Sequence, residues 1–279
     1  MTEDLAEMSL KDDIAGNDRR APETVPVPRA LIPHLNETAV LLDIDGTLLD
    51  LAPTPREVWV PPGLAKTLTR LLERTRGALA LVSGRSLNDI DLIFAPEAFP
   101  AVGGHGAEMR IGTDSEAVAI HAPPMDKELK RRLAAVARLS PGILLEDKGY
   151  SLALHYRLAP HAEKAIYEAV SSIRADLPNA PIEVLPGKCV CEIKHSGFTK
   201  ATGVRELMLR EPFKGRRPFF IGDDVTDESV FAIMPDYDGL AFSVGRRAQG
   251  VAGHFDTPGD VREFLAHLLD DERDPELHT

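Results

Sequence analysis

The chain has 279 residues, of which 43% are hydrophobic and 27% charged, which suits a globular protein of one large or two modest domains. Its formal net charge of -12 and its pI near 5.2 argue against a nucleic-acid partner, because such binding relies on lysine and arginine neutralising backbone phosphates. A small anionic substrate is compatible with this charge, since a few local cations can outweigh the overall field.

Residues 1–36 are predicted to form a flexible N-terminal tail, because they mix charges with prolines and have no helical or strand period. A signal peptide would need a basic start and an apolar stretch, whereas this segment begins with Glu3 and Asp4. No apolar run approaches membrane-spanning length, and the two cysteines, Cys189 and Cys191, form no disulfide framework but are expected on one face of a strand. We therefore expect a cytoplasmic protein with no membrane partner, as a monomer or weak dimer.

Residues 37–112 and 198–279 share one pattern, in which short apolar strands alternate with helices. Such alternation predicts an α/β core of the Rossmann-like type, a parallel sheet with helices on both faces. The expected elements of the first part are strands at 39–42, 78–82 and 101–102, with helices at 64–72 and 87–94. Those of the second part are helices through Val204, from Thr226 and through Val261, with strands at 218–221 and 240–244.

The intervening residues 113–197 have a different pattern, with several short strands and only two helices. Two of these strands, 143–146 and 151–156, flank a short Asp-Lys-Gly turn, which predicts an antiparallel hairpin. The other expected elements are strands at 117–121, 182–185 and 189–194 and helices at 126–139 and 162–173. We therefore predict an α+β domain inserted between the two parts of the core.

The strongest chemical signal is an Asp-x-Asp-Gly-Thr run at 43–47, directly after an apolar strand. This spacing places Asp43 as a nucleophile and Asp45 beside the leaving group, with a glycine at which the chain turns away. A calcium-binding loop would need an acid or asparagine and then a glycine where this chain has Thr47 and Leu48. A structural acidic turn is the other alternative for this run alone.

A second acidic run, Gly-Asp-Asp-Val-Thr-Asp-Glu at 222–228, also follows an apolar strand. Taken alone, it equally suits an acidic helix start in which Thr226 is the N-cap and Asp227 and Glu228 favour the helix dipole. If both acidic runs meet at one sheet edge, unit charges about 4 Å apart repel by roughly 4 kcal/mol at an effective dielectric of about 20. Such a site requires a cation, and its hard oxygen ligands suit Mg²⁺.

Two weaker signals have the same placement. Ser83 follows the strand at 78–82 and can donate to a phosphoryl oxygen, and Lys200 begins a helix and can neutralise one. Taken singly, Ser83 is more often part of a helix-start turn and Lys200 a solvated surface lysine. All four signals lie at or just beyond the carboxyl ends of strands, the edge at which parallel sheets bind their ligands.

These four elements resemble the four motifs of the haloacid dehalogenase (HAD) superfamily, and the insertion resembles its α+β cap of type IIB. More specific stretches are similar to those of trehalose-6-phosphate phosphatases, over about Thr38 to Leu269; they lie at 103–108, 145–150, 154–157, 187–192 and 222–228. Two departures are visible. Ala201 stands where the family usually has glycine after the lysine, and Lys194-His195 where it has Arg-Pro.

The resemblance implies a phosphatase in which Asp43 forms an aspartyl phosphate and Asp45 acts as acid and base. Ser83 and Lys200 would clamp the phosphoryl oxygens. The implied Mg²⁺ ligands are the Asp43 carboxylate, the Asp45 main-chain carbonyl and Asp223, with Asp224 and Asp227 as further acids.

The implied substrate is a sugar phosphate, chosen by groups of the cap. Alternating acids and bases suit a hydroxyl-rich sugar, although without the resemblance they would be interpreted as surface salt bridges. The expected substrate-binding residues are Arg85, His105, Gly106, Glu146, Lys148, Lys188 and Glu192. The implied reaction is hydrolysis of trehalose 6-phosphate. The alternatives are a phosphatase acting on sucrose phosphate or mannosyl-phosphoglycerate, and a non-catalytic regulator that binds a sugar phosphate.

Overall fold

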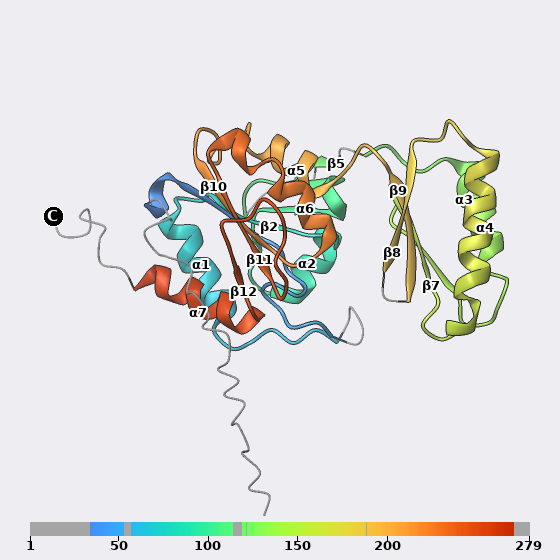
Figure 1. The fold of residues 1–279 in the computed structure, drawn as a ribbon, viewed down its shortest axis with the longest axis horizontal. Helices are drawn as coiled ribbons and strands as arrows, with labels where there is room; N and C mark the ends of the chain where they lie inside the picture. The colour runs from blue at the N-terminus through green and yellow to red at the C-terminus, as the bar shows by residue number, and fades with distance from the viewer. Residues whose placement is uncertain (1–33, 53–56, 114–118, 121, 188, 271–279) are drawn as a thin grey trace, which may run out of the picture.

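The structure is a computed structural model that describes residues 34–52, 57–113, 119–120, 122–187 and 189–270. Most of the predicted tail and Lys188 therefore lie outside the described residues. Figure 1 shows two bodies, a larger one that contains both ends of the described chain and a smaller one formed by the middle of the sequence. Among the described residues, none of the helices is both long and apolar enough to cross a membrane.

The larger body is built on one eight-stranded sheet whose central strands are parallel. In spatial order its strands are β12 (Gly253–Phe255), β11 (Leu240–Val244), β10 (Arg217–Gly222), β1 (Thr38–Leu42), β2 (Leu79–Val82), β3 (Ala101–Gly103), β4 (Glu108–Arg110) and β5 (Ala119–Ile120). The pairs from β12 to β3 are parallel, whereas β4 and β5 continue the sheet antiparallel. The predicted parallel α/β core is confirmed.

Helices cover both faces of this sheet because its central strands are apolar on both sides. The alternating residues of β1 show this: Val40 and Leu42 belong to one hydrophobic cluster, and Ala39 and Leu41 to the other. The first cluster includes residues of α1 (Leu64–Arg74), α2 (Leu87–Phe94) and α7 (Pro258–Leu269). The second includes residues of α5 (Lys200–Leu207) and α6 (Val225–Phe231), on the opposite face in Figure 1. This three-layer packing fixes the strand ends that carry the acidic runs.

The smaller body has an antiparallel four-stranded sheet and a hydrophobic cluster of its own. Its strands, in spatial order, are β6 (Leu144–Asp147), β7 (Ser151–His155), β9 (Val190–His195) and β8 (Ile182–Gly187). The helices α3 (Lys127–Val136) and α4 (Glu163–Asp176) cover one face, and Figure 1 shows the sheet between them and the larger body. Cys191 and Ile193 belong to the cluster beneath the helices, so Glu192, between them, lies on the open face.

Three details differ from the sequence-based expectations. β5 lies within the range predicted for the insertion, but it pairs with β4 of the large sheet. Cys189 lies in the turn before β9, with a positive φ of 59°. The prediction that both cysteines belong to one strand is therefore wrong, since only Cys191 lies in β9. The N-cap of α6 is Asp224 rather than Thr226, because the Asp224 carboxylate accepts a hydrogen bond from the Val225 amide at 2.6 Å.

Candidate active site

Asp43 lies at the carboxyl end of β1 and is almost completely buried. Its amide donates to the carbonyl of Ile221 in β10, which continues the sheet pairing to the tip of the strand. The turn that follows requires glycine at position 46, where φ is +77° and a Cβ would lie 2.0 Å from an Asp223 carboxylate oxygen. Gly46 therefore lets the second acidic run approach the first.

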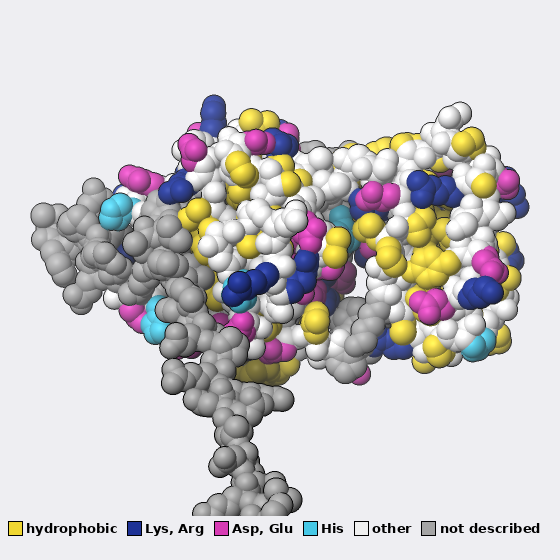
Figure 2. All heavy atoms as spheres, in the orientation of Figure 1, with side chains coloured by type: hydrophobic (Ala, Val, Ile, Leu, Met, Phe, Trp, Pro, Cys, Tyr) yellow, Lys and Arg dark blue, Asp and Glu magenta, His cyan; other side chains and the backbone are white. Residues whose placement is uncertain are grey.

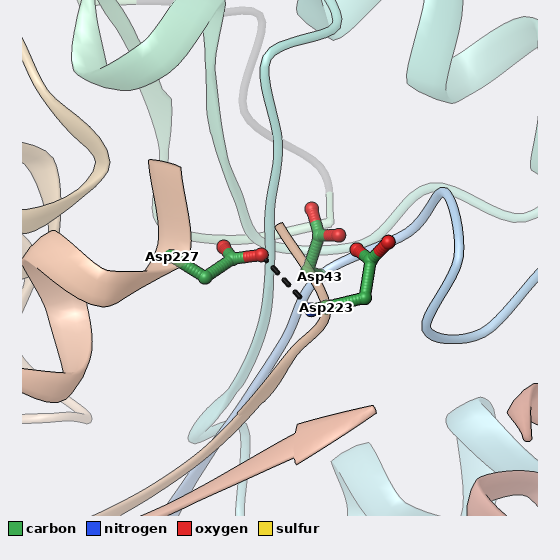
Figure 3. Close-up of side chains that lie close together, drawn as sticks. All are labelled: Asp43, Asp223 and Asp227. Carbon is green, nitrogen blue, oxygen red and sulfur yellow. Dashed lines mark hydrogen bonds between the residues drawn. The ribbon is translucent and has the colours of Figure 1, made fainter. Parts of the chain in front are cut away.

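Asp43, Asp223 and Asp227 bring their carboxylates together at this edge (Figure 3). One oxygen from each lies within 4.8 Å of the others. Asp227 reaches the group from α6 and accepts hydrogen bonds from the amides of Asp223 and Asp224, each at 3.1 Å. The two acidic runs thus meet as the strand-end argument predicted, and Asp227, expected as a further acid, completes the group.

The electrostatics of this cluster favour a bound cation. Burial raises the pKa of Asp43 well above its ordinary value, and the neighbouring carboxylate of Asp227 raises it further. Burial likewise raises the pKa of Asp223 to about 6. Both shifts show that negative charge is costly here, and the available ligands are hard carboxylate oxygens of the kind that divalent cations such as Mg²⁺ prefer.

Lys200 supplies a positive charge inside the acidic cluster. Its Nζ donates to Asp43 Oδ1 and to Asp227 Oδ1, each at 2.7 Å, and its side chain is only 4% exposed. Burial alone would lower the pKa of Lys200, but the two carboxylates outweigh burial and raise it. Lys200 is therefore a buried cation beside Asp43 and not a solvated surface lysine.

The two departures from the family pattern leave this arrangement intact. Ala201, in place of the usual glycine, is buried in the hydrophobic cluster under α5 while Lys200 still reaches the acids. Lys194 is buried in the smaller body and forms an ion pair with Glu183 of β8.

Asp45 makes a different contact from the other acids. Arg85 donates to both of its carboxylate oxygens, from Nε at 2.5 Å and from a terminal nitrogen at 2.6 Å. The guanidinium of Arg85 thus holds the carboxylate of the expected acid and base, and the expected role of Arg85 in substrate binding stays a prediction. Ser83 is buried at the end of β2, where its Oγ accepts a hydrogen bond from the Arg85 amide at 3.2 Å.

His105 connects the larger body to the open face of the smaller one. It has a positive φ of 54°, and its ring fills the space beside Gly84, where a Cβ would lie 2.5 Å away. Its Nε2 lies 3.6 Å from a carboxylate oxygen of Glu192 in β9. The next residue, Gly106, approaches the Thr199 carbonyl so closely that a Cβ would lie 2.2 Å from it.

Glu192 also contacts Lys148 at 3.7 Å and accepts a hydrogen bond from the Ser151 hydroxyl at 3.0 Å. Burial by itself would raise the pKa of Glu192, but His105, Lys148 and Ser151 together lower it to about 2. Glu146, on β6, which β7 separates from β9, instead contacts His155 at 2.8 Å. Figure 2 shows acidic and basic side chains around the recess between the two bodies. Most of the predicted substrate residues described by the structure thus lie on or beside one charged surface.

Two further residues near the site had no role predicted from the sequence. Thr47 is fully buried, and its hydroxyl donates to Asp43 Oδ2 and lies equally close to Asp223 Oδ1, at 3.4 Å. Its place in the Asp-x-Asp-Gly-Thr run was a usable signal. Tyr150 is 4% exposed and packs against Gly104, where a Cβ would lie 2.5 Å from the Tyr150 hydroxyl. No local pattern marks that contact, because it joins the two bodies.

Comparisons with known sequences identify the family. The sequence model described as trehalose-phosphatase matches residues 41–253. The trehalose-6-phosphate phosphatase of Escherichia coli (strain K12) is 38% identical over 228 residues, which are 81% of this chain and 85% of that protein. A probable trehalose-phosphate phosphatase of Sinorhizobium fredii is 41% identical over 217 residues, 77% of this chain and 81% of its relative.

Comparisons with solved structures confirm the fold. The C-terminal domain of the C. albicans trehalose-6-phosphate phosphatase has a TM-score of 0.71 at 21% identity, covering 84% of this chain and 92% of that one. A phosphatase of the haloalkanoate (HAD) enzyme superfamily from Bacteroides thetaiotaomicron has a TM-score of 0.57 at 16% identity, covering 86% and 98%. Because the family model spans most of the sequence and both curated relatives exceed 30% identity, this chain belongs to the trehalose-phosphatase family, a family of phosphatase enzymes with the HAD fold.

Proposed function

We propose that this protein hydrolyses trehalose 6-phosphate to trehalose and inorganic phosphate in a reaction that requires Mg²⁺. The observation that carries the proposal is the meeting of Asp43, Lys200, Asp223 and Asp227 at one sheet edge, opposite the charged surface around Glu192. The names of the two bacterial relatives support this substrate, because each alignment covers more than four fifths of the relative.

In the proposed first step, an oxygen of Asp43 attacks phosphorus as the bond between phosphorus and the sugar oxygen breaks, which gives an aspartyl phosphate. Lys200 holds Asp43 Oδ1 and Thr47 lies beside Oδ2, so the nucleophile is fixed in direction before substrate arrives. Asp45 donates a proton to the departing sugar oxygen, and the two hydrogen bonds from Arg85 hold its carboxylate in place.

In the second step, Asp45 takes a proton from a water molecule as the water oxygen attacks phosphorus, which releases phosphate and restores Asp43. The Asp43 and Asp223 carboxylates and the Asp45 main-chain carbonyl would hold Mg²⁺. When bound, the cation offsets the negative charge of the phosphoryl oxygens. Lys200 and Ser83 are the proposed partners of those oxygens, because Lys200 contacts Asp43 and Ser83 follows β2, the strand paired with β1.

The smaller body is the proposed sugar-binding cap. Its open face presents Glu146, Lys148 and Glu192, whose ionised groups can bond sugar hydroxyls as acceptors and donors. The contact between Glu192 and His105 brings this face against the larger body, so a sugar phosphate can reach cap and nucleophile together. Lys188, which lies between β8 and β9 in the sequence, is proposed as a further residue that binds the sugar.

The test is phosphate release from a panel of sugar phosphates, with and without Mg²⁺. We expect trehalose 6-phosphate to give the highest kcat/KM, excess EDTA to abolish turnover, and added Mg²⁺ to restore it. A clear preference for sucrose phosphate or mannosyl-phosphoglycerate would reject the substrate assignment, and full activity in EDTA would reject the metal requirement. No turnover of any member of the panel would favour the non-catalytic regulator.

A further inference from the structure

Arg246 contacts the main chain of Asp223 from outside the carboxylate cluster. Its Nε donates to the Asp223 carbonyl oxygen at 3.1 Å, and a terminal nitrogen donates to Glu228 Oε1 in α6 at 2.7 Å. We propose that Arg246 is a positioning residue that fixes Asp223 for metal binding. This inference rests on the metal site proposed above.

The hydrogen bonds of Asp223 show why one further contact matters. Asp223 lies just past the last residue of β10, where the sheet pairing ends. Its amide is held by Asp227 Oδ2 at 3.1 Å, and its carbonyl is held by Arg246. Side chains from two other segments therefore hold both polar atoms of the Asp223 main chain, which fixes the direction in which its carboxylate leaves the chain.

Arg246 reaches Asp223 because of how the neighbouring strand ends. β11 lies beside β10, with Ser243 paired to Gly222, so the two strands end at nearly the same level. Gly245 then adopts a positive φ of 70°, and its amide donates to the Phe255 carbonyl at 2.9 Å. This turn directs Arg246 back across the tip of β10, and the salt bridge to Glu228 holds the guanidinium there.

A positioning role and a simple charge effect predict opposite changes in metal affinity. A cation close to a metal site repels the metal, so removal of its charge alone would strengthen Mg²⁺ binding. Loss of a hydrogen bond that orients a metal ligand weakens binding instead, typically by about ten- to a hundredfold. Weaker Mg²⁺ binding in the Arg246→Ala variant would therefore show that Arg246 acts by positioning Asp223 and not by its charge.

Arg247 offers a matched control. It is the adjacent arginine and is exposed, and within the described part of the chain it forms no hydrogen bond or ion pair. Arg247→Ala removes the same charge from the same turn without touching Asp223. Arg246→Lys keeps the charge but loses the planar guanidinium that donates to two acceptors. Its Mg²⁺ affinity should therefore lie between those of wild type and Arg246→Ala.

The experiment is calorimetric titration of Mg²⁺ into metal-free protein without substrate, with the melting temperature of each metal-free variant as a folding check. We expect Arg246→Ala to raise the Mg²⁺ dissociation constant about ten- to a hundredfold, and Arg247→Ala to leave it unchanged or lower. Equal affinities in the two alanine variants would overturn the inference. If Arg246→Ala does not fold, Arg246→Lys decides, and wild-type affinity in that variant would overturn it.

Asp223→Ala separates this inference from the proposed function. If wild type binds Mg²⁺ and Asp223→Ala does not, the metal site stands and the Arg246 variants test positioning alone. If wild type and Asp223→Ala give the same titration, the proposed metal site fails, and the role of Arg246 fails with it.

Discussion

At the scale of single residues, the site is dominated by the concentration of buried carboxylates around one lysine. Asp43 and Asp227 both contact Lys200, and Asp223 stands beside them with its pKa raised. Buried carboxylates that lie close together destabilise the folded state unless a cation offsets their negative charge. Clusters of this kind are therefore typical of functional sites.

The first prediction concerns the nucleophile. Asp43→Asn should lower phosphate release by roughly a thousandfold or more, because an amide is nearly isosteric but a far poorer nucleophile. The matched control is Asp50→Asn, which alters an exposed aspartate whose ion pair with Arg262 is 3.3 Å long. Activity is measured by phosphate release and folding by circular dichroism. Near-normal turnover in Asp43→Asn would reject the covalent step.

The second prediction concerns pH. The folded, metal-free pKa of Asp223 is about 6, above its ordinary value of 3.8, so between these values the folded state binds more protons than the unfolded one. Metal-free stability should therefore fall as pH rises through this window, and the increase in melting temperature on adding Mg²⁺ should grow. Glu192 affects stability at lower pH. Because its folded pKa of about 2 lies below its ordinary 4.5, the stability that it contributes is lost as pH falls through this range.

The measurement is the melting temperature with and without Mg²⁺ from about pH 5 to about pH 7.5, a range chosen to cross the Asp223 transition. Asp223→Asn is the control: because it lacks one of the proposed metal ligands, its melting temperature should respond little to Mg²⁺ at any pH in this range. A Mg²⁺ effect that is constant across the range would contradict the coupling between metal binding and this carboxylate.

The sequence predicted those residues whose position depends only on strand ends. Asp43 and Asp223 follow buried apolar strands, and the rule for parallel sheets was enough to bring them together. The pairing of Arg85 with Asp45 could not be predicted, since it depends on side-chain directions across the sheet edge. Arg246 was missed for the same reason, because it acts on a main-chain atom that no motif identifies.

At the scale of elements, the turn Gly104–Gly106 joins the two bodies, through Tyr150 and through Glu192. Gly104 has a positive φ of 55°, and Tyr150 of the β6–β7 turn packs against it. Tyr150 belongs to a small hydrophobic cluster with Ala107 and Ala122, and Phe198 packs against it. This cluster joins the larger body to the residues at both ends of the insertion.

The third prediction tests this contact. Gly104→Ala should destabilise the protein by about 1 to 3 kcal/mol, because a Cβ would clash with Tyr150 and the backbone would adopt a left-handed conformation that alanine disfavours. The matched control is Gly112→Ala, where a Cβ meets nothing within 4 Å. Chemical denaturation measures both variants. If Gly104→Ala were as stable as Gly112→Ala, Tyr150 would not be closely packed against Gly104.

Most elements were predictable because their periods are long or their strands wholly apolar. The helix at 87–94 and the β6–β7 hairpin lie where the sequence placed them. β4 and β12 were missed, since Glu108–Arg110 and Gly253–Phe255 contain no apolar run of the kind that marks the central strands. They form because the edges of the large sheet offer unpaired backbone groups, which is a property of the assembled fold.

At the scale of the whole molecule, the proposed site is divided between a larger body that would carry out the chemistry and a smaller body that would bind the sugar. The fourth prediction follows from this division. Glu192→Ala should lower kcat/KM for trehalose 6-phosphate by about ten- to a hundredfold, because loss of a buried contact costs about 1 to 3 kcal/mol. A small aryl phosphate, which reaches Asp43 without the cap, should keep nearly its original rate.

The quantity to compare is the ratio of kcat/KM values for the two substrates. Glu168→Ala is the control, since this glutamate lies on α4, away from the open face of the cap sheet, and pairs with an exposed Lys164. If Glu192→Ala lowers kcat/KM for both substrates by the same factor, Glu192 stabilises the contact between the two bodies and does not bind the sugar. If neither falls, the sugar contacts lie elsewhere.

The strand order of the large sheet also has a consequence for the order of folding during synthesis. β1 lies between β2 and β10, so one of its edges stays unpaired until residues 217–222 have been made. The inserted body has its own hydrophobic cluster and depends on no such late partner. Before those residues emerge from the ribosome, we expect the nascent chain to carry a folded inserted body attached to an incomplete sheet, and the exposed edge of that sheet is where the nascent chain is most prone to aggregate.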